Sequence, residues 1–122
     1  MAIHESGEDY LETILVLKKK NGMVRSIDVA SELGYSKPSV SRAMGILKKS
    51  GYVITDEKGY ISFTDEGLEL AERIYERHEN ITKFLTDVLG VSEENAMKDA
   101  CRIEHDLSDE TYRKICEALA NK

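Results

Sequence analysis

The sequence has few of the features that mark secreted, membrane-spanning or disulfide-rich chains. Its 122 residues include one proline, two cysteines and no tryptophan. No apolar run approaches the roughly 20 residues that span a bilayer. The first residues lack a basic stretch followed by an apolar one, so no secretory signal is expected. Cys101 and Cys116 are expected to be reduced thiols rather than a disulfide framework, as in a cytoplasmic protein.

Motifs of several enzyme classes are missing as well. The sequence contains no His-Glu-x-x-His, no Cys-x-x-Cys and no glycine-rich phosphate loop, so the usual zinc-hydrolase, zinc-finger and nucleotide-binding interpretations lose support. We therefore expect that the protein is not an enzyme. The hydrophobic share of 41% is enough for a folded core, and the length suits one domain or a small domain with a helical appendage.

Charge is distributed unevenly along the chain. Residues 1–63 carry nine Lys/Arg and eight Asp/Glu, a net of +1, whereas residues 64–122 carry eight and fifteen, a net of −7. No acid occurs between Glu32 and Asp56, and this window holds Lys37, Arg42, Lys48 and Lys49. A basic stretch on an acidic protein indicates a surface for phosphates, although a solvated helix face is the plain alternative.

Periodicity predicts three helices in the first half of the chain. The first covers residues 5–20 and ends at Asn21-Gly22. The second covers residues 27–33, with Ser26 as its N-cap. Ser36-Lys37-Pro38 opens the third, with proline in the first turn, and Gly51 ends it. We expect the apolar side of the third helix to consist of Val40, Ala43, Met44, Ile46 and Leu47.

The pattern then changes to two short strand-like runs, residues 52–55 and 60–63, around Asp56-Glu57-Lys58-Gly59, which indicates a hairpin. Further helices are predicted at about residues 65–89, 92–105 and 108–119. Three helices followed by a hairpin form a winged helix-turn-helix. The expected fold is therefore mainly α: a winged helix-turn-helix DNA-binding domain over residues 1–63, then a helical metal-binding and dimerisation domain over residues 64–122.

The third helix is the expected DNA-reading element, because the second helix of a helix-turn-helix lies in the major groove with its N-terminal residues at the base edges. Arg42 can make a bidentate contact to guanine. Phosphate contacts are expected from Lys48, Lys49 and the hairpin's Lys58. Ser36 and Ser39 could instead only cap the helix, and winged helices also bind proteins. The predicted DNA-facing residues at the start of this helix are Ser36, Lys37, Pro38, Ser39, Ser41 and Arg42.

Three segments hold potential metal ligands. Asp9 and Glu12 are spaced to share one helix face, and His78 lies in the long helix. Cys101, Glu104 and His105 place a thiol, a carboxylate and an imidazole at positions i, i+3 and i+4 of a helix, where they could chelate one ion. Each residue alone has a plainer explanation, as a first-turn acid, a solvated histidine or a small core residue.

At this point the chain resembles a known family, the diphtheria-toxin-repressor family of metal-dependent regulators, and in particular its short manganese-transport-regulator branch. The resemblance covers nearly the whole chain. The segments that carry it are Glu8-Asp9-Tyr10-Leu11-Glu12, Ser36 to Ser41, Leu47 to Tyr52, Thr64-Asp65-Glu66-Gly67, Arg77-His78-Glu79, Ala100 to His105 and Leu107-Ser108-Asp109-Glu110.

The resemblance implies two adjacent metal positions. The first would use Asp9, Cys101, Glu104 and His105, and the second Glu12, His78, Glu104 and the side chain at 101. The manganese branch has a carboxylate where Cys101 stands, and the iron branch has a methionine where Asp9 stands. The first site is therefore a hybrid of the two branches. Fe²⁺ or Mn²⁺ is the expected physiological ion, with Zn²⁺, Co²⁺ or Ni²⁺ able to bind in vitro because a thiolate favours them.

The resulting hypothesis is a repressor that binds operator DNA as a homodimer when its ion is bound and so controls metal homeostasis. The alternative is a metal-independent winged-helix regulator that senses a small organic ligand. No role is assigned to His4 or Cys116, which we interpret as tail and core residues. The iron branch carries a further SH3-like domain, which is not expected in this chain.

Overall fold

A computed structural model of the chain describes residues 5–121, together with the side chains of residues 7–121. His4 lies outside the described residues. The chain divides into two compact units, Met1–Glu72 and Arg73–Lys122, and the division falls within helix α4. Each unit is considered by itself below. In the described part of the chain, every helix is too short or too polar to cross a membrane.

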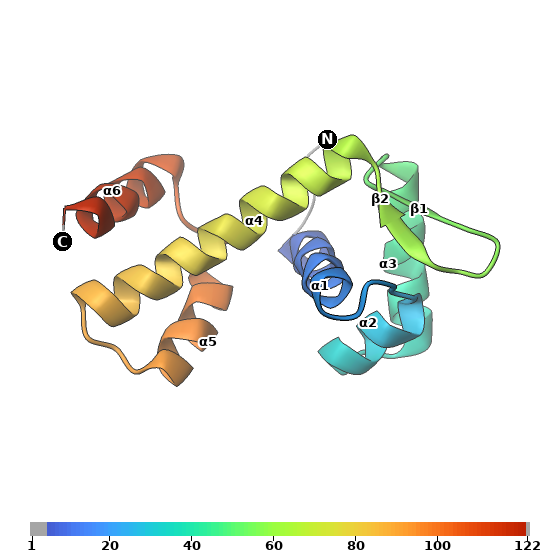
Figure 1. Cartoon of the computed structure of the whole chain (residues 1–122), viewed down its shortest axis with the longest axis horizontal. Helices are drawn as coiled ribbons and strands as arrows, with labels where there is room; N and C mark the ends of the chain where they lie inside the picture. Colours follow the sequence, from blue (N-terminus) through green and yellow to red (C-terminus); the bar gives the residue numbers. More distant parts are fainter. Residues whose placement is uncertain (1–4, 122) are drawn as a thin grey trace. The chain divides into compact units, whose positions relative to one another are not determined.

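The N-terminal unit contains three helices, a two-stranded antiparallel sheet and the first part of α4 (Figure 1). Strand β1 pairs with β2 in the register Val53↔Phe63, which forms the expected wing. Helix α2 packs on both α1 and α3, and α3 also packs on β1. The elements are α1 (Glu5–Asn21), α2 (Ser26–Leu33), α3 (Lys37–Lys49), β1 (Val53–Thr55), β2 (Ile61–Phe63) and α4 (Asp65–Lys83). The expected mainly helical fold with a winged helix-turn-helix is confirmed.

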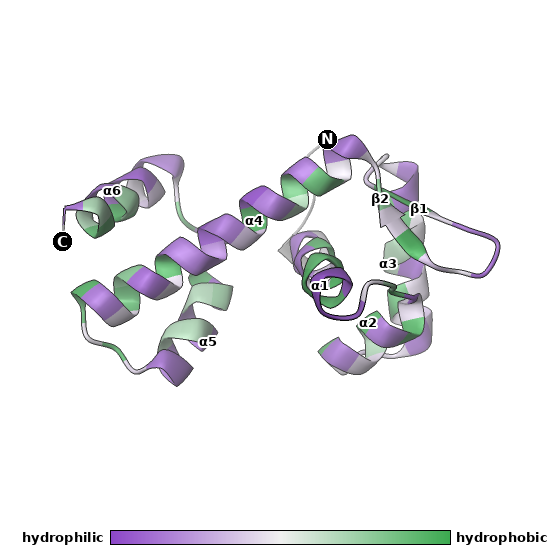
Figure 2. Ribbon diagram, in the orientation of Figure 1, coloured by the Kyte–Doolittle hydropathy of each residue, from purple (hydrophilic) through white to green (hydrophobic). Residues whose placement is uncertain are grey.

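An aliphatic core holds this unit together. Side chains from every helix and both strands are buried, and the largest fully buried ones include Leu11, Ile14, Val24, Val29, Val40, Leu47, Val53 and Ile61. Figure 2 shows hydrophobic residues along α1 and the hairpin, whereas α4 is mostly hydrophilic. Burial of each such side chain stabilises the folded state by about 1.5–3 kcal/mol. Helix α3 is therefore anchored to this core.

The turn of the helix-turn-helix is formed as the sequence predicts. Gly34 adopts a left-handed conformation (φ 71°) at the C-cap of α2, where a side chain would be strained. Ser36 caps α3, with its hydroxyl oxygen accepting a bond from the Ser39 amide. The prediction that Ser26 caps α2 is wrong. Arg25 occupies the cap position, and its amide donates to Asp28 Oδ2 at 2.9 Å.

One residue of α3 lies on a different side of the helix from the one predicted. Ile46 was expected on the apolar side of the helix, but 56% of it is exposed. Val40, Met44 and Leu47 alone form the buried side of α3. The helical period places Ile46 well away from their mean direction, so its hydrophobicity misled the assignment.

The start of α4 is fixed by a close approach to the turn between α3 and β1. A side-chain carbon on Gly67 would collide with the backbone carbonyl oxygen of Tyr52. The Thr64 hydroxyl accepts a bond from the Gly67 amide at 3.0 Å and donates to the Gly51 carbonyl at 2.6 Å. Thr64 therefore caps α4 and also links α4 to the turn before β1.

The C-terminal unit consists of helices alone. The second half of α4 continues into a wider π-type turn, η1 (Phe84–Val88), which packs against both α5 (Glu93–Ile103) and α6 (Asp109–Ala120) (Figure 1). Ser92 and Ser108 cap α5 and α6 by accepting bonds from the amides of Asn95 and Thr111. The predicted single helix over 65–89 thus ends in a π turn, and the predicted fifth helix ends two residues early, at Ile103.

Candidate metal centre and DNA-binding face

The C-terminal unit brings four of the predicted ligands together: the buried carboxylate of Glu104 and three residues near it. Glu104 is only 3% exposed and is the single buried charged residue among the described residues. Its Oε2 lies 3.2 Å from His78 Nδ1, and its Oε1 lies 3.3 Å from His105 Nε2. The two carboxylate oxygens therefore each face one imidazole.

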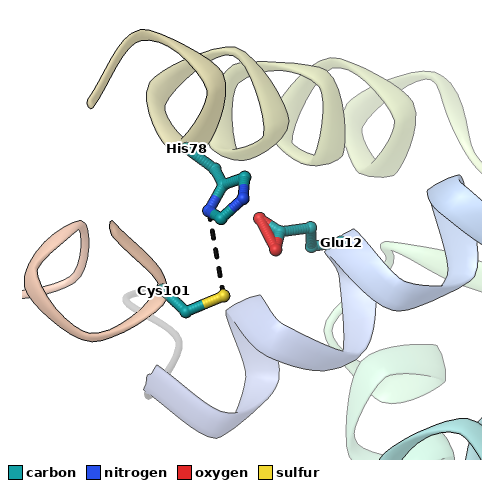
Figure 3. Close-up of side chains that lie close together, drawn as sticks. All are labelled: Glu12, His78 and Cys101. Carbon is teal, nitrogen blue, oxygen red and sulfur yellow. Dashed lines mark hydrogen bonds between the residues drawn. The ribbon is translucent and has the colours of Figure 1, made fainter. Parts of the chain in front are cut away.

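Cys101 joins this group through His78. Its Sγ lies 3.8 Å from the same Nδ1 atom that faces Glu104. Figure 3 shows the thiol of Cys101 and the ring of His78 pointing toward each other, from α5 and α4 respectively. Cys101 is exposed, whereas the side chains of His78, Glu104 and His105 are 15%, 1% and 3% exposed.

Local structure explains how the three C-terminal ligands come together. Cys101 lies in the last turn of α5, and Glu104 is the C-cap residue with near-helical angles (φ −58°, ψ −30°). Its amide still donates to the Ala100 carbonyl at 3.0 Å, so the helical spacing of positions 101 and 104 is kept. His105 lies beyond the helix end. The expectation of one helix carrying all three ligands is thus only partly correct.

In the N-terminal unit, the remaining two predicted ligands lie on α1. Asp9 and Glu12 are both half-buried and are one helical turn apart, so they share a face of the helix. Between them, Tyr10 is 6% exposed and packs edge-on against Tyr35, with ring centroids 6.0 Å apart. Burial, and then the Tyr35 phenol, raise the pKa of Tyr10.

The donor set of the C-terminal unit fits a divalent transition ion. Two imidazoles, a carboxylate and a thiol are ligand types of Mn²⁺, Fe²⁺ and Zn²⁺ sites. A carboxylate buried as deeply as that of Glu104 is costly unless cations surround it. Neutral imidazoles offer only partial compensation, whereas a bound dication would offset the cost.

The predicted DNA-facing residues form an exposed surface on α3 and the wing. All nine of them are exposed: Ser36, Lys37, Pro38, Ser39, Ser41, Arg42, Lys48, Lys49 and Lys58. The Ser36 hydroxyl also donates to Ser39 Oγ at 2.8 Å, so both serines take part in the cap. The N-terminus of α3 carries no acid in its first turn, which favours an approaching phosphate.

Two arginines with defined positions were missed by sequence reasoning. Arg25 is exposed, stacks over the Tyr60 ring at 4.5 Å and pairs with Tyr60 through its backbone. Arg77 binds the Leu107 carbonyl at 2.6 Å. Arg77 lies in one of the segments that carry the family resemblance, so a signal for it existed. Arg25 is one isolated cation and offered none.

Family models match the two halves of the chain. The model described as the iron dependent repressor N-terminal DNA-binding domain matches residues 2–61. The model described as the iron dependent repressor metal-binding and dimerisation domain matches residues 64–122.

Individual proteins agree with these matches. An HTH-type transcriptional regulator of Methanocaldococcus jannaschii is 35% identical over 91% of this chain and 90% of its own length. The HTH-type transcriptional regulator MntR of Geobacillus kaustophilus is 36% identical over 84% of this chain and 72% of its own. A manganese-dependent transcriptional repressor, solved in complex with manganese, superimposes with a TM-score of 0.86 at 26% identity over 93% of this chain. This chain spans only 52% of that solved protein.

Proposed function

We propose that this chain is a cytoplasmic transcriptional repressor that binds operator DNA as a homodimer when Fe²⁺ or Mn²⁺ is bound. The chain belongs to the iron-dependent repressor family. Its relatives are transcriptional regulators and not enzymes, so the expected class of function is confirmed.

The observation that carries the proposal is the buried Glu104 carboxylate with an imidazole at each oxygen. We assign His78, Cys101, Glu104 and His105 as ligands from the C-terminal unit. Asp9 and Glu12 are proposed as ligands from α1, because the family pattern maps onto them and they share one face of that helix. The bound ion would supply positive charge to this set of acids.

A ligand set drawn from both units explains how metal controls DNA binding. With the ion present, the DNA-reading head is tied to the dimerisation unit, which fixes two α3 helices about one DNA turn apart, roughly 34–36 Å, or a multiple of it. Without the ion, Asp9, Glu12 and Glu104 repel one another. Such coupling is typically about 1–3 kcal/mol and is reciprocal, so operator DNA should tighten metal binding.

The central experiment is DNA binding by the purified chain to a pool of genomic fragments, in excess chelator and with Mn²⁺, Fe²⁺ or Zn²⁺ in turn. We expect selective retention of a few fragments only when a metal is present. Equal retention in chelator would instead support the small-ligand regulator, which the relatives do not favour.

His105→Ala tests the ligand assignment. We expect this variant to lose metal-stimulated DNA binding in a gel-shift titration while it remains a dimer by light scattering. Asp106→Ala is the matched control, because Asp106 is the exposed neighbour of His105 and is not a proposed ligand. Metal stimulation that survives in His105→Ala would remove His105 from the site.

Cys101 is expected to set the choice of ion. A thiolate favours Fe²⁺, Co²⁺, Ni²⁺ and Zn²⁺, whereas carboxylate oxygens suit Mn²⁺. We expect Cys101→Glu to raise the affinity for Mn²⁺ relative to Zn²⁺ in calorimetric titrations. An unchanged ratio of the two affinities would show that Cys101 is not a ligand.

Arg42 is the proposed base-reading residue, and Lys48 a phosphate contact. Arg42→Ala should weaken binding to the selected fragments by about 1–3 kcal/mol and to random DNA much less. Lys48→Ala should weaken both kinds of DNA equally and reduce the salt dependence. Equal losses in Arg42→Ala would assign Arg42 to phosphate contact as well.

A further inference from the structure

The connection between α5 and α6 carries two proposed ligands outside regular helix. Glu104 caps α5, and His105 follows it in the turn before α6 begins at Asp109. Turns are more mobile than helices unless other contacts hold them. A metal site gains affinity when its ligands are already in place before the ion arrives.

Arg77 supplies such contacts from α4. Its Nη2 donates to the backbone carbonyl of Leu107 at 2.6 Å, only two residues beyond His105. Its guanidinium carbon lies 4.9 Å from the centre of the Tyr112 ring, in a cation–π contact with the first turns of α6. Nη1 lies 3.7 Å from Asp109 Oδ1, but that carboxylate is fully exposed, so the pair contributes little.

Helix α4 also contacts the hydroxyl end of the Tyr112 side chain. Asn80, one turn after Arg77, donates from Nδ2 to the Tyr112 hydroxyl at 2.9 Å. Burial raises the pKa of this phenol. Arg77 thus contacts the ring of Tyr112, and Asn80 binds its hydroxyl. Arg77 also hydrogen-bonds to the turn before α6.

We infer that Arg77 is a positioning residue for the metal ligands Glu104 and His105, an inference that rests on the proposed function. Arg77 directly precedes His78 on α4, so one helical turn both carries a ligand and holds the segment that carries two more. A guanidinium suits this position because its planar fork can bind a carbonyl and stack on an aromatic ring together. Arg77 itself is not proposed as a ligand.

The test compares Mn²⁺ affinity in the full-length chain, measured by competition with a fluorescent chelator at a temperature where every variant is folded. Arg77→Met should bind Mn²⁺ at least about tenfold more weakly than the unmodified chain, as expected when a ligand-orienting contact is lost. Tyr112→Leu removes the stack and the hydrogen bond from Asn80 but keeps the bond from Arg77 to the Leu107 carbonyl. It should lose about threefold or more in affinity, and it serves as a second variant if Arg77→Met does not fold. Asp109→Asn, which removes only the exposed ion pair, should change the affinity by less than about twofold.

Absorption of the Co²⁺ complex separates positioning from general damage. Cys101 lies within α5, outside the held turn, so the sulfur-to-cobalt charge-transfer band should persist in Arg77→Met at saturating Co²⁺. A purely structural role for Arg77 predicts a lower melting temperature with unchanged Mn²⁺ affinity, and that result would overturn the inference. If the unmodified chain binds no Mn²⁺, Fe²⁺ or Co²⁺, the proposed function itself fails, whereas equal affinities in the unmodified chain and Arg77→Met reject the positioning role alone.

Discussion

Each of the two units of the molecule is stabilised internally, and the kind of contact differs between them. The N-terminal unit buries branched aliphatic side chains from its first three helices and from both strands, such as Leu11, Val29 and Ile61. The C-terminal unit buries only four apolar residues among those described, namely Ile74, Ile81, Ala96 and Ala100. All of α6 lies in the described part, and none of its side chains is buried.

Polar contacts replace the missing core of the C-terminal unit. Arg77, His78 and Asn80 on α4 bind Leu107, Glu104 and Tyr112 respectively. Apolar residues such as Val88, Leu89 and Met97 remain exposed in the single chain. We therefore predict that the N-terminal unit is the more stable of the two, and that the proposed ion and second subunit contribute most to the stability of the C-terminal unit.

Leucine truncations give the largest expected effect. Leu47→Ala in α3 should lower the free energy of unfolding by about 2–5 kcal/mol, because the residue is 2% exposed and leaves a cavity. Leu119→Ala in α6 is the matched change at a half-buried position and should cost less than half as much in metal-free protein. Urea denaturation measures both, and equal losses would contradict the difference between the units.

Metal addition should stabilise mainly the C-terminal unit. A saturating ion at a hundred times its dissociation constant stabilises the binding state by about 2.7 kcal/mol. We expect hydrogen exchange to slow most in residues 100–112, and least in the buried centre of α3. Equal slowing in both regions would show that the C-terminal unit is as stable without metal as the core of the N-terminal unit.

Glycine substitutions test the packing of the N-terminal unit at a finer scale. Gly67→Ala should destabilise by about 1–3 kcal/mol, because the new carbon meets the Tyr52 carbonyl and both are backbone-anchored. Gly45→Ala in α3 is the matched helical change with open space around it and should stabilise by about 0.4–1 kcal/mol. Thermal melts of both variants measure the difference, and a stabilised Gly67→Ala would mean that α4 can move away from the turn before β1.

The sequence predicted the helix-turn-helix and wing well, because Gly34, Ser36 and Thr64 mark element ends through local backbone chemistry. It failed at Ile46, where hydrophobicity alone was taken for burial, and at Ser26, where an arginine holds the cap position instead. The spacing of Cys101, Glu104 and His105 indicated a ligand group. The contact between Arg77 and Leu107 could not be predicted, since it depends on how α6 returns to α4.

Alkaline pH should test the contacts of the C-terminal unit through the half-buried phenol of Tyr112. Burial raises the pKa of Tyr112 above the ordinary tyrosine value, which is about 10. The folded state therefore favours the neutral phenol, and this contribution is complete below the ordinary pKa and is lost as pH rises through the raised one. Tyr112→Phe keeps the ring beside Arg77 but cannot ionise, so the loss of stability as pH rises above about 10 should be smaller than in the unmodified chain. Urea midpoints measured at a series of alkaline pH values would contradict this contribution of the Tyr112 phenol if Tyr112→Phe lost stability as steeply as the unmodified chain.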